Sequence, residues 1–380
     1  MYMIEIKSLT KKFGSLTVFE DLNVKVQKGE VLVIIGPSGS GKSTFLRCLN
    51  HLENPDGGEV FIEGEMLNVK NKRHMRNTIE KVGSIHFWGL KAPLGALFCI
   101  WGSGAMLTSA PFDDWWHNAY GLDVKILSPP HALLAIGILS IQMGSLFSIL
   151  SFQNSSPNPG FWKQIYIVSS AISVCIAYIF VIEFMSRSKM HHPLFYQVAG
   201  GVFPLMLLSA STAAKVKFPA TKIALIYMII FIAALWIFPL FPAEPKLSPV
   251  KTPTDHFVPL PFPLLLIIPA LGLDLVRKKV DHLNKWIQAF TLAITFLICL
   301  FICQYNFSDF LISPASRNWF FATHEWAFYL DPNAPLRYSY LPFKGTSLDF
   351  IKGLSIVLIL TTFSSWLAIK WGVWMQKIKR

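Results

Sequence analysis

A run of glycines, hydroxyl side chains and one lysine at residues 36–43, here called the glycine loop, has the composition of a phosphate-binding loop. It follows an apolar run at 31–35 and leads into a helix-forming stretch at 44–49. Glycines let successive backbone N–H groups point at one anion, and the helix N-terminus adds a partial positive charge. In this pattern Lys42 reaches the β- and γ-phosphates of a nucleotide, and the Ser43 hydroxyl binds Mg²⁺. The alternative, an ordinary glycine-rich turn, does not explain the flanking strand and helix.

The glycine loop lies in a charged, soluble-looking segment, residues 1–83, whose apolar residues alternate as in strands. Alternation at 4–6 and 18–26 predicts two strands, and the residues at 59–62 predict a third after a turn. The helix that follows the loop should end near residue 53. The pattern therefore predicts a domain of mixed strands and helix around the glycine loop.

Residues 1–83 resemble the ATP-binding subunits of ABC transporters, most closely the type that serves polar amino acid uptake. The stretches IEIKSLTKKFGSLTVFEDLNVKVQKGE and GPSGSGKSTFLRCLNHLENPDGGEVFIEG carry this resemblance. It implies that Phe13 stacks on adenine, although an aromatic at a strand end can also be a core residue. It further implies that Ser43 holds Mg²⁺ and that ATP is bound by Gly36, Pro37, Ser38, Gly39, Ser40, Gly41, Lys42, Ser43 and Thr44.

The resemblance ends at Gly83, before the family's glutamine loop, signature motif, Walker B aspartate with its catalytic glutamate, and switch histidine. Two later stretches, 176–183 and 199–201, partly resemble a Walker B strand and a signature motif, but the first lies inside a long apolar run and the second has no signature context. The resemblance therefore implies a partial α/β P-loop NTPase head that binds ATP, with impaired hydrolysis because the groups that position water and stabilise charge are missing. Whether the chain is an enzyme stays open. A second ABC subunit or a homodimer is the implied protein partner.

Apolar runs dominate the remainder of the chain, residues 84–380. Hydrophobic residues make up 53% and charged residues 15% of the 380 residues, whereas about 25% charged is usual in soluble proteins. A helix needs about 20 apolar residues to cross a bilayer. We therefore predict an all-α polytopic membrane domain of about eight transmembrane helices, at residues 90–109, 130–151, 162–184, 195–214, 220–240, 260–276, 286–305 and 351–371.

Basic residues indicate the orientation of this membrane domain. The net charge is +12, but no basic stripe with interleaved aromatics is present, so nucleic acid is not an expected partner. With residues 1–83 in the cytoplasm, the basic cluster at 277–279 and the basic C-terminal end also lie inside, as the positive-inside rule requires. Arg187 and Lys189 fall on the external side, against this trend. The prediction is a multi-pass protein of the cell inner (plasma) membrane with both termini in the cytoplasm.

Six of the ten histidines fall on the predicted external side or at its interface, near several carboxylates. Imidazole and carboxylate groups together are typical of Zn, Cu or Fe sites, so His117, His131 and His324 are candidate metal ligands. The alternative is that they accompany an interfacial aromatic belt. No two of them show a tight ligand spacing within one helix, which favours the belt.

Three interpretations stay open at this point. The chain is an ABC-type transport component with its own membrane domain, or it is a polytopic membrane protein with a function in its external loops to which an ABC segment has been added. In the third, it is a composite in which segments of two genes are joined between Gly83 and Ser84. The composite interpretation is favoured, because the join falls inside what would be a strand of the ABC family's sheet, whereas natural fusions usually meet in linkers.

Overall fold

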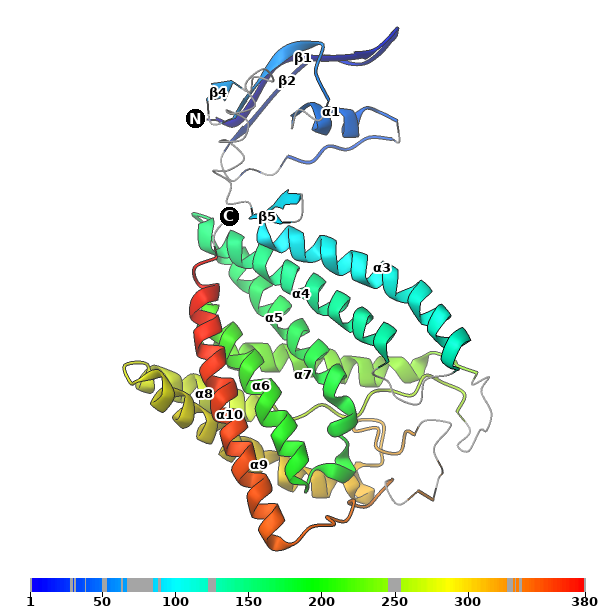
Figure 1. Ribbon diagram of the computed structural model, residues 1–380, viewed down its shortest axis with the longest axis vertical. Helices are drawn as coiled ribbons and strands as arrows, with labels where there is room; N and C mark the ends of the chain where they lie inside the picture. The colour runs from blue at the N-terminus through cyan, green and yellow to red at the C-terminus, as the bar shows by residue number, and fades with distance from the viewer. Residues whose placement is uncertain are drawn as a thin grey trace. The chain divides into compact units, whose positions relative to one another are not determined.

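The computed structural model describes residues 2–27, 30, 32–37, 39–49, 53–62, 64–66, 85–87, 90–121, 128–244, 254–326, 331, 333–334 and 337–378. The chain divides into two compact units, Met1–Pro93 and Leu94–Lys379 (Figure 1). The first unit contains strands and a short helix, and the second is helical.

An antiparallel sheet forms the main part of the first unit. Its strands are β1 (Tyr2–Phe13), β2 (Leu16–Gln27), β3 (Gly57–Ile62) and β4 (Glu65–Met66), in the order β2-β1-β3-β4. β1 and β2 form a hairpin whose turn uses Gly14 at a φ of 60°, a backbone conformation that favours glycine. The three strands that alternation predicted are confirmed.

Helix α1 (Lys42–Leu49) packs its apolar side against this sheet. Phe45 and Cys48 are buried in a small core, and the Phe45 ring meets the edge of Phe19 at a centroid distance of 5.8 Å. A second, short hairpin is made by β5 (Ile85–Phe87) and β6 (Leu90–Ala92). The hydrophobic core of the first unit is therefore small, and its buried members among the described residues are Ile6, Leu9, Phe45, Cys48 and Val60.

The predicted strand at 31–35 is not formed in its described part, so this prediction was wrong. Residues 32–37 are irregular, and Leu32, Val33 and Ile35 are 49%, 69% and 88% exposed. Parallel strands of α/β proteins are stable when neighbouring strands and helices cover them on all sides. No strand in the described part of the sheet pairs with this run. The head is thus only in part the α/β P-loop fold that the resemblance implies.

The second unit is all-helical, as predicted. Its long helices have the length and hydropathy to cross a membrane, and the described residues contain seven such segments. Apart from short 3₁₀ turns, its helices are α3 (Leu94–Tyr120), α4 (Pro129–Ser155), α5 (Gly160–Val181), α6 (Pro193–Ala213), α7 (Pro219–Ile237), α8 (Ile267–Val280), α9 (Lys285–Ile312) and α10 (Ser347–Met375).

The predicted sixth span, residues 260–276, is not a membrane-length helix, so the described residues contain seven membrane-length helices and not the eight that were predicted. Helix α8 has 14 residues, or about 21 Å at 1.5 Å per residue, and the residues before it at 257–265 are not helical. Prolines at 259, 261 and 263 cause this, because proline has no N–H to donate and its ring clashes with the preceding turn of a helix.

The non-helical stretch before α8 is buried among helices that satisfy its backbone. The Leu264 N–H donates to the Tyr227 hydroxyl at 3.3 Å, and the Leu265 N–H donates to Gln304 Oε1 at 3.0 Å. Leu264 itself is fully buried. Irregular backbone at membrane depth is tolerated where protein groups replace the missing helical partners. Tyr227 of α7 and Gln304 of α9 provide such partners here.

Glycines allow α3 and α4 to lie side by side at backbone contact (Figure 1). A Cβ atom added to Gly102 would meet the carbonyl oxygen of Gly137 at 2.7 Å, and one added to Gly137 would meet that of Gly102 at 2.9 Å. Gly95 and Gly144 face each other in the same way, at 2.6 and 2.5 Å. Small residues commonly mediate helix packing in membranes, because polar-group burial and close packing, rather than water exclusion, stabilise the contact.

Replacing Gly102 with valine should destabilise the α3–α4 contact by about 1–3 kcal/mol, the usual effect of overpacking. The thermal unfolding midpoint of the detergent-solubilised protein measures this. Gly104→Val is the matched control, because a Cβ at Gly104 of the same helix meets nothing within 4 Å. Equal midpoints for the two variants would show that the close contact is not present.

Candidate functional site

The glycine loop has a backbone that requires glycine at two positions. Gly39 and Gly41 have φ values of 83° and 84°, in the left-handed region. A Cβ at Gly41 would also lie 2.5 Å from Cγ1 of Val18, so no side chain fits there. Ser38, one of the predicted phosphate contacts, lies outside the described residues. The described part of the loop therefore has the conformation that its glycines predict.

The ammonium group of Lys42 lies against its own loop. Nζ donates hydrogen bonds to the carbonyl oxygens of Gly36 at 2.7 Å and Pro37 at 2.6 Å, and to Oγ of Ser40 at 3.1 Å. A bound phosphate would replace these neutral acceptors with charged ones, and such hydrogen bonds are about twice as strong. The loop thus places its one cation where an anion held by the loop would contact it.

Helix α1 begins at Lys42, so its first turn carries the other predicted phosphate and Mg²⁺ residues. Ser43 is exposed and Thr44 is half-buried. The Phe45 N–H already donates to the Gly41 carbonyl at 2.8 Å, and no acidic side chain stands in this turn. An anion would therefore meet the positive end of the helix without competition from a carboxylate on the same turn.

Phe13, the predicted adenine-stacking residue, lies at the end of β1 and is 47% exposed. It is not a core residue. Its ring is covered by Nζ of Lys11, which lies 4.7 Å from the ring centroid. Cation–π contact of this kind leaves one face of the ring for another partner. Adenine stacking on Phe13 stays a prediction.

Lys11 is a residue that sequence reasoning missed. Its side chain is buried, and Nζ lies 2.7 Å from the Asn54 carbonyl oxygen, 3.3 Å from Glu53 Oε1 and 3.5 Å from Asp56 Oδ2. It therefore joins the end of β1 to the turn that follows α1. A lysine within an alternating strand gives no signal of contacts more than forty residues away.

The three candidate metal ligands are not brought together. His117 and His131 both face Asp113, with Nε2 to Oδ1 distances of 3.4 and 3.5 Å. His324 belongs to a different cluster, where its Nε2 lies 3.0 Å from Glu325 Oε1. Among the described residues no group of three or more His, Cys, Asp or Glu is arranged to hold a metal ion. The predicted three-histidine site is therefore not formed, because His117 and His131 lie in α3 and α4, whereas His324 lies in the segment between α9 and α10.

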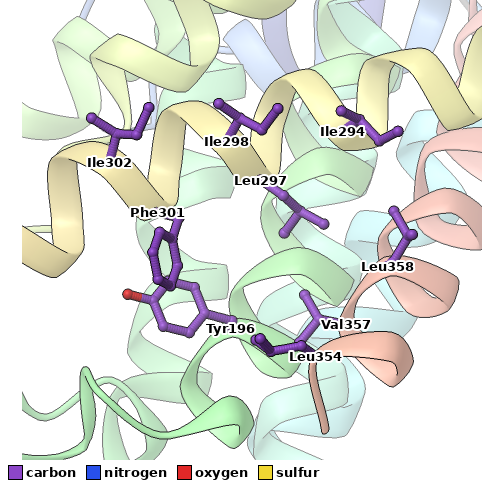
Figure 2. Close-up of a pocket in the computed structure, with 9 residues that line it drawn as sticks. All are labelled: Tyr196, Ile294, Leu297, Ile298, Phe301, Ile302, Leu354, Val357 and Leu358. Carbon is purple, nitrogen blue, oxygen red and sulfur yellow. The ribbon is translucent and has the colours of Figure 1, made fainter. Parts of the chain in front are cut away.

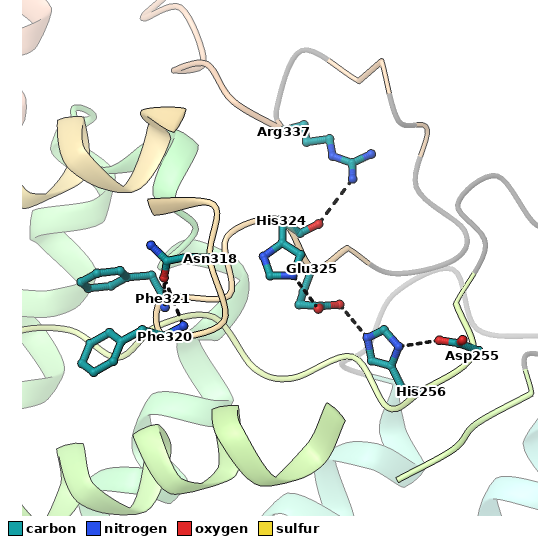
Figure 3. A network of polar contacts seen from close by, with 8 residues as sticks. All are labelled: Asp255, His256, Asn318, Phe320, Phe321, His324, Glu325 and Arg337. Atoms are coloured by element: carbon teal, nitrogen blue, oxygen red, sulfur yellow. Dashed lines mark hydrogen bonds and ion pairs between the residues drawn. The ribbon is translucent and has the colours of Figure 1, made fainter. Parts of the chain in front are cut away.

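His256, which lies between α7 and α8, bridges two carboxylates (Figure 3). One belongs to its neighbour Asp255, and the other belongs to Glu325, next to His324. Nδ1 of His256 lies 2.7 Å from Asp255 Oδ1, and its Nε2 lies 2.8 Å from Glu325 Oε2. The hydrogen bonds to Asp255 and then to Glu325 raise the pKa of His256 above its ordinary value. We call Asp255, His256, Glu325 and His324 the histidine–carboxylate chain.

An apolar hollow of about 390 Å³ lies between α6, α9 and α10 (Figure 2). Its walls are aliphatic and aromatic side chains such as Ile298, Phe301 and Leu358, and the Tyr196 hydroxyl is its polar atom. A surface of this kind on membrane-length helices fits a hydrocarbon chain. Apart from the Tyr196 hydroxyl, its lining side chains are hydrocarbon and carry no acid, base or metal ligand.

Residues 19–88 match the sequence model of the ABC transporter family. The matched segment contains the glycine loop, α1, β3 and β5, and it ends between β5 and β6, before the helical unit begins at Leu94. The predicted boundary between residues 83 and 84 lies outside the described residues and stays a prediction.

Similar proteins match the same part of the chain. The L-cystine import ATP-binding protein TcyN of Bacillus subtilis is 56% identical over 68 residues, which are 18% of this chain and 26% of that protein. The methionine import ATP-binding protein MetN of Mesorhizobium japonicum is 42% identical over 87 residues, 22% of this chain and 24% of that protein. The arginine transport ATP-binding protein ArtM of Bacillus subtilis is 44% identical over 87 residues, 22% of this chain and 36% of that protein.

The chain thus spans between 24% and 36% of the length of these relatives. The predicted resemblance to amino acid uptake ATP-binding proteins is confirmed for this segment. The matches do not extend to the helical unit.

The raised pKa of His256 predicts a pH-dependent stability. A pKa that is higher in the folded than in the unfolded protein means that protonation of His256 favours folding. The bridge therefore contributes fully to the free energy of unfolding below the unfolded-state pKa of about 6.5, and this contribution is lost as the pH rises through the folded-state pKa. His256→Gln should therefore cost about 1 kcal/mol at pH 6 and little at pH 9, as measured by unfolding midpoints across this range.

His282→Gln is the matched control for this measurement, because His282 is exposed and lies outside the histidine–carboxylate chain. A His256 variant whose midpoint follows the wild-type pH profile throughout would show that the bridge does not stabilise the fold.

Proposed function

We propose that the N-terminal segment, residues 1–83, is a truncated ABC-type nucleotide-binding domain that binds ATP with Mg²⁺ through the glycine loop. The single observation that carries the proposal is the placement of Lys42 inside a loop whose glycines at 39 and 41 have left-handed backbone, at the start of α1. The family match over residues 19–88 supports the same function. Phe13 would stack on adenine, and Ser43 would hold Mg²⁺.

Hydrolysis by this chain alone is proposed to be impaired. After residue 88 the chain continues into a helical unit, and the sequence there has no glutamine loop, signature motif or catalytic glutamate in family context. The exposure of Leu32, Val33 and Ile35 supports this, because the run before the loop lacks the neighbours that would fix the loop for catalysis. A second ABC subunit or another copy of this chain would be needed to close the site.

The helical unit, residues 84–380, is proposed to cross the membrane eight times with both termini in the cytoplasm. Seven crossings would use the membrane-length helices, and the sixth would combine the extended stretch before α8 with α8 itself. Asp274 of α8 supports this path, because its carboxylate accepts hydrogen bonds from the Ala220 N–H at 3.2 Å and the Thr221 N–H at 2.8 Å, at the start of α7.

That contact places the C-terminal part of α8 at the same end of the bundle as the beginning of α7. The chain must therefore return across the bundle between the end of α7 and the end of α8. Arg277, Lys278 and Lys279 lie at this end, and by the positive-inside rule they support its assignment to the cytoplasmic side. The proposed location is accordingly multi-pass in the inner (plasma) membrane, with the nucleotide-binding segment in the cytoplasm.

Replacing Lys42 with alanine should weaken ATP binding by about 10- to 100-fold, the loss expected for a hydrogen bond to a charged phosphate. Titration of the purified full-length chain with a fluorescent ATP analogue measures it. Lys25→Ala removes an exposed positive charge of the same unit and should bind like the wild type. Equal affinity of the Lys42 and Lys25 variants would refute the proposed loop function. Phosphate release by the wild type at an ordinary enzymatic rate, about 1 s⁻¹ or faster, would refute impaired hydrolysis.

A second candidate is that residues 1–83 and 84–380 belong to different proteins, so that the helical unit has its own function. The separation into two compact units and the uncovered apolar run at 32–35 favour it. Sequencing of source DNA across codons 83 and 84, with an immunoblot for the full-length chain, decides between the candidates. A continuous reading frame and a full-length band support one protein, and absence of the junction supports two.

A further inference from the structure

Three arginines from two distant parts of the chain converge on one aromatic ring. The Cζ atoms of Arg187, Arg317 and Arg337 lie 5.6, 3.6 and 5.6 Å from the ring centroid of Tyr338. Arg187 lies between α5 and α6, whereas the other two lie between α9 and α10. The fold therefore gathers three guanidinium groups in one place, which costs electrostatic free energy unless negative charge is present.

A second ring holds two of these guanidinium groups. Trp326 has Arg187 at 4.9 Å and Arg337 at 5.6 Å from its ring centroid. All five distances lie within the ~6 Å range of cation–π contact. The aromatic rings orient the guanidinium groups but accept none of their conventional hydrogen bonds, so the N–H groups stay available for an acceptor.

Carboxylates do not neutralise this arginine cluster. Within the part of the chain that the structure describes, no Asp or Glu makes an ion pair with Arg187, Arg317 or Arg337. Arg337 donates from Nη2 to the backbone carbonyl of His324 at 3.4 Å (Figure 3). Glu325, next in sequence to that histidine, is already engaged by His256 and His324.

Three buried donors of the cluster have no hydrogen-bond partner among the residues that the structure describes. They are Nη2 of Arg187, Nε of Arg337 and Nε1 of Trp326. Buried donors are normally satisfied, because leaving one unpaired forfeits the hydrogen bonds it made to water. Burial, together with the charges of Arg337 and Arg317, lowers the pKa of Arg187 to about 10. Arg317 is exposed, so the cluster is open to the surface on its side.

We propose that Arg187, Arg317 and Arg337, with Trp326 Nε1, form a binding site for a phosphate group. Several oxygen acceptors and more than one negative charge match three guanidinium groups better than a single carboxylate does. The phosphate group is supplied either by free inorganic phosphate or by the head group of an anionic lipid, and both present the same oxygens to the arginines.

Titration of the detergent-solubilised full-length protein with inorganic phosphate tests the proposal, with calorimetry and the unfolding midpoint as readouts. Phosphate should raise the midpoint of the wild type by mass action. Arg187→Gln should bind phosphate at least about tenfold more weakly. Arg317→Gln should also bind more weakly, and its exposed side chain makes it the variant that keeps its fold.

Lys189→Gln is the matched control, because it removes one positive charge two residues from Arg187 and leaves the cluster intact. A parallel titration with phosphatidylglycerol in neutral-lipid nanodiscs distinguishes the two sources of the phosphate group. Weaker binding of either ligand by Arg187→Gln and Arg317→Gln, but not by Lys189→Gln, supports the site. Absence of binding of both ligands by the wild type, or equal binding by all three variants, overturns it.

Discussion

Backbone hydrogen bonding is the constraint on which the helical unit depends. In an apolar environment every backbone N–H and C=O group needs a partner within the protein. Seven of the described segments provide these partners by forming membrane-length helices. The stretch before α8 cannot, because prolines alternate at 259, 261 and 263. There the acceptors come from neighbouring helices, through Tyr227 and Gln304. These two side chains therefore accept the backbone hydrogen bonds that helical carbonyl groups accept elsewhere, and they place α7 and α9 next to the non-helical stretch.

The first unit meets the opposite difficulty, because it has apolar surface without enough structure to cover it. Its core gathers around Phe45 and Cys48 of α1 and the sheet, whereas the run at 32–35 stays exposed. A small domain buries a smaller fraction of its surface than a large one and is correspondingly marginal. The described part of the glycine loop is held by the backbone of its glycines, by the start of α1 and by the contact of Gly41 with Val18 of β2.

Local features of this protein could be predicted from the sequence, and features that depend on distant residues could not. Antiparallel strands and the glycine loop follow from neighbouring residues. The strand at 31–35 was predicted wrongly because its stability depends on partners elsewhere in a sheet. Hydropathy alone could not tell the broken sixth segment from a helix. His256 and Glu325 pair across 69 positions, and no spacing rule reports such a contact.

The glycine loop has an energetic consequence that follows from its own lysine. Because Lys42 is bound by Gly36, Pro37 and Ser40, the loop is already closed around a cation. Nucleotide entry would be an exchange reaction, in which three neutral oxygens leave the ammonium as phosphate oxygens arrive. The measured affinity would then report the difference in free energy between the hydrogen bonds of the Lys42 ammonium to the loop oxygens and its hydrogen bonds to the phosphate. A substitution that weakens the hydrogen bonds to the loop would therefore tighten nucleotide binding, although the substituted residue does not contact the nucleotide.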